Sequence, residues 1–161
     1  MQQAPPIKVR STLVNLSARN VLIEAGVQYP PVPAKQLLEK YAIVKWFDHP
    51  SEEGFCFKKS GAYYICLNRS MVKGRDNYTY GHELGHIVMG HLDINYETVT
   101  DYHMAKIKRE ADLFAACLLM PEDWVRSSCG GSPPNLQSIG DMVRVFDVSW
   151  EAMTIRLEQL D

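Results

Sequence analysis

The pentapeptide His82-Glu83-Leu84-Gly85-His86 constrains this chain more than any other stretch. On an α-helix, residues four apart lie on one face about one turn apart, so both imidazoles would point the same way. That spacing suits two ligands of one tetrahedral zinc ion. Glu83 lies about 100° further round the helix, where a carboxylate can act as general base on a metal-bound water. The pattern therefore predicts a Zn2+ site with His82 and His86 as ligands and Glu83 as catalytic residue.

A catalytic zinc needs a third protein ligand. In the pattern HExxHxxGxxH a glycine turn brings in a third histidine, but Met89 and Leu92 stand at those two positions. Glu110 fits a second scheme, in which a glutamate comes from a following helix, with 23 residues between it and the second histidine. His103 and Asp93 from the intervening linker form a third scheme that no spacing favours. Glu110 is the predicted third ligand.

The surroundings of Glu110 add a physical reason. It lies between Ile107 and Phe114 on the apolar face of a predicted helix. Burying an unpaired carboxylate costs several kcal/mol, so this group needs a cationic partner or must be protonated. A zinc ion held by two neutral histidines would provide it; the alternative is an ion pair with Lys106 or Arg109.

An oxyanion partner beyond the metal is usual in such sites. Tyr78, Tyr80, Tyr102 and His103 carry suitable donors. The sequence does not choose among them, and packing or surface roles explain each, so none is assigned.

Length and pattern predict one domain over residues 1–161, with 1–10 as a flexible tail. The predicted class is α+β: a small, mostly antiparallel three-stranded sheet packed with helices and a C-terminal helix pair. Zinc would lie between two helices in a zincin-like, gluzincin-type arrangement. The predicted helices are 11–25, 78–90, 104–119, 136–146 and 149–160, with a further short helix that has Pro33 in its first turn and carries Leu37, Leu38 and Tyr41. The predicted strands are 42–47, 54–58 and 62–67.

Composition limits the partners. The net charge of −2 creates no field for nucleic acid or an anionic membrane. The longest apolar run, 113–120, is too short to span a bilayer. The four cysteines form no CxxC pair and the N-terminus has no signal pattern, so we expect free thiols and a cytoplasmic protein.

Two blocks resemble the ImmA/IrrE family of metallopeptidases. Residues 76–91 are similar to its active-site segment, and residues 109–121 resemble its second block, a glutamate followed by Phe-Ala and Leu-Leu-Met-Pro. Weaker similarity covers most of the chain. Asp112 departs from the asparagine common there, a change that preserves a small polar role.

The resemblance implies zinc bound by His82, His86 and Glu110, with Glu83 catalytic. It also implies a substrate class, because family members characteristically cleave helix-turn-helix (XRE-type) repressors in mobile-element or stress-response systems. We expect that repressor to be a separate protein.

Two non-enzymatic readings compete. A zinc-containing module could sequester a repressor or toxin without cutting it, although the intact Glu83 argues against pure binding. The final helix pair is loosely like a helix-turn-helix. However, residues 149–160 offer one cation, Arg156, against Glu151 and Glu158, so packing explains this pair better than DNA recognition.

Overall fold

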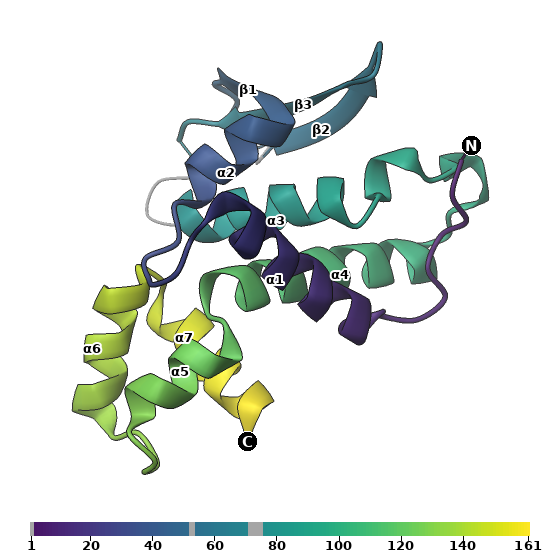
Figure 1. Cartoon of the computed structure of the whole chain (residues 1–161). Coiled ribbons are helices and arrows are strands. Elements are labelled where there is room, and N and C mark those ends of the chain that lie inside the picture. The colour runs from purple at the N-terminus through teal and green to yellow at the C-terminus, as the bar shows by residue number, and fades with distance from the viewer. Residues whose placement is uncertain (1, 52–53, 71–75) are drawn as a thin grey trace.

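The computed structural model describes residues 2–51, 54–70 and 76–161. Over these residues the chain is α+β, with a small sheet on one side of a helical body and three short helices at the other end (Figure 1). The elements are α1 (Ser11–Ala25), α2 (Ala34–Tyr41), β1 (Ala42–Phe47), β2 (Gly54–Lys59), β3 (Ala62–Asn68), α3 (Asp76–Val88), the 3-10 turns η1 (His91–Asp93) and η2 (Tyr96–Thr98), α4 (Asp101–Leu119), α5 (Glu122–Cys129), α6 (Leu136–Phe146) and α7 (Trp150–Leu160).

Local sequence accounts for the ends of several helices. Gly26 ends α1 with φ 69°, and its N–H bonds back to the carbonyls of Ile23 and Leu22. The Ser149 hydroxyl accepts the N–H of Ala152 and so caps α7. The predicted spans of α1 and α6 are confirmed, and that of α7 is confirmed with Ser149 as its N-cap.

The sheet is mixed, which corrects the mostly antiparallel expectation. The strands predicted at 54–58 and 62–67 form a hairpin: β2 pairs antiparallel with β3 across Ser60 and Gly61, which have φ of 51° and 78°. However, the strand order is β1-β3-β2, and β1 pairs with β3 in parallel. Ile65 and Leu67 make β3 the most buried strand, so it takes the central place with a neighbour on each side.

Helices α3 and α4 lie against each other at the centre of the molecule (Figure 1). A Cβ at Gly81 would lie 3.3 Å from the Ala115 Cβ, and one at Gly85 would lie 3.0 Å from the Phe114 Cβ and 3.2 Å from the Ala111 Cα. The two helices are therefore antiparallel, and the glycines of α3 lie against α4. The close packing on helix α4 explains why these two positions carry no side chain.

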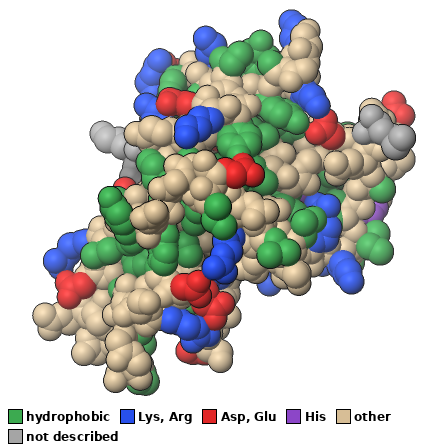
Figure 2. All heavy atoms as spheres, viewed as in Figure 1, with side chains coloured by type: hydrophobic (Ala, Val, Ile, Leu, Met, Phe, Trp, Pro, Cys, Tyr) green, Lys and Arg blue, Asp and Glu red, His purple; other side chains and the backbone are tan. Residues whose placement is uncertain are grey.

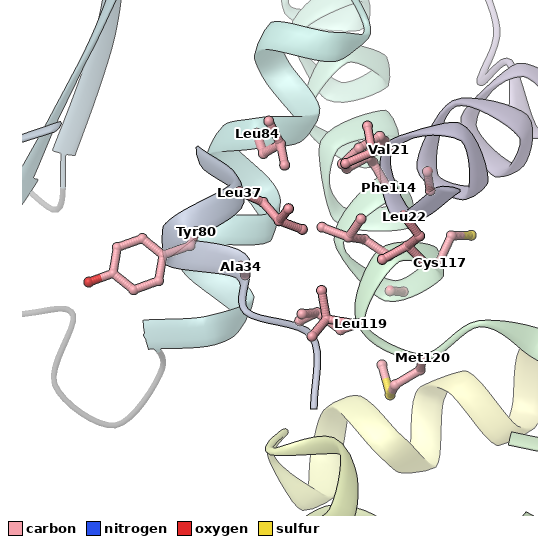
Figure 3. Packing of buried hydrophobic residues seen from close by; sticks show 14 of the residues in the cluster. Val21, Leu22, Ala34, Leu37, Tyr80, Leu84, Phe114, Cys117, Leu119 and Met120 are labelled. Carbon is pink, nitrogen blue, oxygen red and sulfur yellow. The ribbon is translucent and has the colours of Figure 1, made fainter. Parts of the chain in front are cut away.

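Apolar side chains from four helices meet around this contact. Figure 3 shows Val21 of α1, Leu37 of α2, Leu84 of α3 and Phe114 of α4 in one cluster, all buried. The Tyr80 ring points away from this cluster and makes an edge contact with Trp46 of the sheet. The core thus fixes the face that α3 turns towards α4.

The N-terminal segment departs from the expected flexible tail. The Gln3 N–H donates to the Asp93 carbonyl at 2.8 Å, and Gln3 forms a bridge with Ile94. Arg10 makes an ion pair with buried Glu110. A segment with few apolar residues is held by backbone hydrogen bonds and one charge pair, which hydrophobic periodicity does not detect.

The C-terminal helices pack as the sequence favoured. The Arg156 side chain is buried, and its Nε donates to the Met120 carbonyl at 2.9 Å. The one cation of α7 is therefore used inside the protein. Figure 2 shows Lys and Arg interspersed with Asp and Glu over the visible face, and none of the helices in the described ranges is long and apolar enough to cross a membrane.

We predict that Gly85→Val lowers the free energy of unfolding by about 1–3 kcal/mol, because the new side chain would meet Phe114 and Ala111. Urea denaturation measures the effect. The matched control is Ala105→Val at an exposed position of α4, which carries only the β-branching cost of less than about 0.7 kcal/mol. Equal effects at the two sites would contradict the close contact.

Candidate metal centre

The two motif histidines project from α3 as the spacing predicted. Their ring centroids lie 4.7 Å apart, and the Nε2 atoms of His82 and His86 lie 3.0 Å apart. Both side chains are partly buried. The pair therefore presents two ring nitrogens to one point.

Asp112 of α4 orients the first histidine. Its Oδ1 lies 2.8 Å from the His82 Nδ1. A carboxylate accepts, so Nδ1 carries a proton, and this tautomer leaves Nε2 available as a metal ligand. Asp112 is thus a positioning residue for His82.

A second chain of hydrogen bonds orients His86. The His91 Nε2 lies 2.9 Å from Glu110 Oε2, and the His91 Nδ1 lies 3.0 Å from the His86 Nδ1. If Glu110 is ionised, neutral His91 donates from Nε2 and accepts at Nδ1. The His86 Nδ1 then donates, which leaves its Nε2 with a bare lone pair.

The shifts in pKa agree with neutral rings. Burial, then the charges of His82, His91 and Lys108, lower the pKa of His86 to about 3. Burial also lowers the pKa of His91, against the opposing effect of Glu110. Both rings are neutral at pH 7.

The two orientations bring two lone pairs face to face. Two nitrogens bound to one tetrahedral zinc at 2.0–2.1 Å would lie about 3.3 Å apart. The observed 3.0 Å is close to that separation. His82 and His86 therefore fit two of the positions around a zinc ion.

Glu110 does not complete the centre. Its side chain is fully buried, and its Oε1 accepts the backbone N–H of Arg10 at 2.8 Å and the guanidinium Nε at 2.9 Å. Its Oε2 accepts Arg10 Nη2 at 2.6 Å as well as the His91 ring N–H. Burial raises the pKa of Glu110, but the hydrogen bonds from Arg10 and His91 outweigh it and lower the pKa overall.

The reason for predicting Glu110 was sound, but the partner differs. The buried carboxylate has a protein cation beside it, and that cation is Arg10 and not Lys106 or Arg109. In residues 2–51, 54–70 and 76–161, no group of three His, Cys, Asp or Glu side chains is placed to hold a metal ion. The described residues therefore provide two ligands for a zinc ion, His82 and His86, and do not provide the third that a catalytic centre needs.

Glu83 lies beside the pair and close to strand β2. Burial raises its pKa, while the charge of His82 lowers it. Burial and then the charge of Glu83 raise the pKa of Cys56 on β2 to about 12. Glu83 thus sits between the histidine pair and the edge of the sheet, with a pKa shifted towards that of a base.

Three of the candidate oxyanion donors have other partners. The Tyr78 hydroxyl donates to the Asp112 carbonyl at 3.1 Å, and burial raises its pKa to about 12. The Tyr102 hydroxyl donates to the Ile7 carbonyl, and His103 forms a capping box with Thr100 at the start of α4.

Sequence reasoning missed Arg10, His91 and Asp112 as parts of the site. His91 stands five residues after His86, which is not a ligand spacing on a helix, but Gly90 ends the helix with φ 74° and turns His91 back behind His86. Asp112 had a usable signal: the Gly-x3-Gly of α3 packs on an Ala-x3-Ala of α4, and that register places Asp112 opposite His82. Arg10 had none, because 100 residues separate it from Glu110.

A groove of about 1140 Å³ runs between α1, α4 and α7. Its walls include Asn15, Leu113 and Ile155, and it reaches the site at Asp112. It is large enough to take a segment of another molecule.

Fold and site together define a peptidase-like α+β domain with an HExxH helix. The family model described as the IrrE N-terminal-like domain, a peptidase family, matches residues 41–158. The chain belongs to this family, and the resemblance found in the sequence is confirmed.

Other comparisons add the fold alone. Among curated proteins no sequence matches. A solved structure titled "Mycobacterium tuberculosis transcriptional regulator" is similar with a TM-score of 0.64 and 15% identity, over 89% of this chain. This chain spans 46% of that protein, just under half its length.

We predict that Arg10→Met lowers the free energy of unfolding by about 2–4 kcal/mol, because it leaves the Glu110 carboxylate buried without a counter-charge. Urea denaturation at pH 7 measures it. Arg19→Met is the control, since Arg19 and Asp123 form an exposed pair at 3.8 Å worth less than about 1 kcal/mol. Adding Glu110→Gln to Arg10→Met should recover part of the loss; no recovery would contradict the charge argument.

Proposed function

We propose that this chain binds another protein, a helix-turn-helix repressor encoded separately, and relieves repression by sequestering it in the cytoplasm. The repressor would belong to a mobile-element or stress-response system, as the ImmA/IrrE resemblance implies. Membership of a peptidase family supports a protein as partner.

Strand β2 supports a partner that binds in extended form. It is an edge strand, and no strand of the described residues pairs with its outer edge. Phe55 and Phe57 on its outward face are 54% and 39% exposed, which favours contact with another apolar surface. The inward-facing Cys56 lies near Glu83, so a bound segment would pass beside the histidine pair.

The observation that favours binding over cleavage is the state of Glu110. Its carboxylate is shared between Arg10 and His91, and His82 and His86 gain no third ligand from the described residues. Two imidazoles alone hold zinc less firmly than the three ligands of a catalytic centre.

A zinc-dependent endopeptidase that cleaves the repressor is the second candidate. It is favoured by the two Nε2 atoms 3.0 Å apart and by the half-buried Glu83, whose raised pKa suits a general base. In this reading Glu83 holds and passes the proton, while the metal would activate water and polarise the scissile carbonyl.

One experiment separates the two. The protein is mixed with the helix-turn-helix repressor proposed as its partner, with and without added zinc. Complex formation is followed by size-exclusion chromatography and repressor length by mass spectrometry. We expect wild type and Glu83→Gln to bind the repressor equally and to leave it intact. We also expect the bound repressor to stop binding DNA.

Two results would overturn the proposal. Shortening of the repressor by wild type and not by Glu83→Gln would establish the endopeptidase. Absence of any complex would reject the repressor as partner.

A further inference from the structure

The residue of α4 that lies opposite His86 is a lysine. Asp112 bonds to His82, and Lys108 stands four residues earlier on α4, on the same helical face one turn away. Because α3 and α4 are antiparallel, one turn back on α4 corresponds to one turn forward on α3. That turn carries His86. The charge of Lys108 is close enough to contribute to the low pKa of His86.

Glu110 cannot serve this face. Glu110 lies two positions along the helix from Lys108 and two from Asp112, which places it about 200° round the helix from each. It is fully buried against Arg10 and His91, whereas Lys108 is exposed. On the face that α4 shares with the histidine pair, the position beside His86 therefore belongs to residue 108.

A lysine there has the wrong chemistry for a ligand. Its ammonium group has three donors and no lone pair, and its charge opposes a second cation nearby. A carboxylate is an ordinary third ligand beside two histidines. We infer that Lys108 occupies the position of the third metal ligand, so that this chain binds zinc weakly, and that a carboxylate at this single position completes the centre. This deepens the proposed function, because it gives the reason why the family site binds without cutting.

The test is the zinc affinity of Lys108→Glu, measured by competition with a chromophoric chelator. We expect about a 100-fold or greater gain over wild type, with one zinc per chain. Lys108→Gln removes the charge and adds no carboxylate, and should gain far less. Adding His82→Ala to Lys108→Glu should abolish the gain. Lys108 is exposed, so folding of each variant can be verified by urea denaturation.

Arg109→Glu is the matched control, since it makes the same change in net charge one residue along. An equal gain in Arg109→Glu would overturn the inference, as would wild type that already binds zinc as tightly as Lys108→Glu. The measurement contains no repressor. A missing repressor complex therefore contradicts the proposed function alone, and a missing zinc gain contradicts the role of Lys108 alone.

Discussion

The ion pair between Arg10 and Glu110 supports the whole site. Glu110 has no access to solvent, so its negative charge is tolerable only with the guanidinium beside it. The charged carboxylate then fixes the proton of His91, and His91 fixes the proton of His86. The direction of the lone pair on His86 is therefore set by the charge of Glu110, which acts through the hydrogen bonds of His91.

The helix contact supplies the other half of the geometry. Small residues on both sides let α3 and α4 approach closely, with Gly85 against Phe114 and Ala111. This register brings Asp112 to His82 and places Lys108 on the turn of α4 opposite His86. The scaffold that orients two ligands is thus complete, and the identity of one exposed side chain decides whether a third is present. Positioning and ligation are separable in this fold.

Local patterns predicted what local physics controls. Helical periodicity predicted the spans of α1 and α6. The positive φ angles of Ser60 and Gly61 form the turn between the two strands predicted on either side of them. The histidine pair followed from spacing of four on a helix. The parallel pairing of β1 and β3 was missed, because strand order depends on which strand can be buried on both sides and not on the turn residues.

The partner of Glu110 was missed for a related reason. The sequence indicates that a buried carboxylate needs a cation, but not which cation. Zinc, Lys106, Arg109 and Arg10 all satisfy the same electrostatic requirement. Only the fold selects Arg10, from a segment whose sequence predicted a tail. The number of residues after the motif favours Glu110 as third ligand. The helical face of α4 that carries Asp112, however, carries Lys108 and not Glu110.

The attachment of the N-terminal segment makes the site non-local in folding. Arg10 and Glu110 close a loop of about 100 residues. Contacts between residues so far apart in the sequence form slowly, because bringing the two ends of the loop together costs conformational entropy. The histidine pair therefore has its final proton arrangement only when Arg10 lies against Glu110 on α4. A truncated chain without Arg10 would carry the full HExxH helix and still lack the guanidinium that keeps Glu110 ionised and so orients the second histidine.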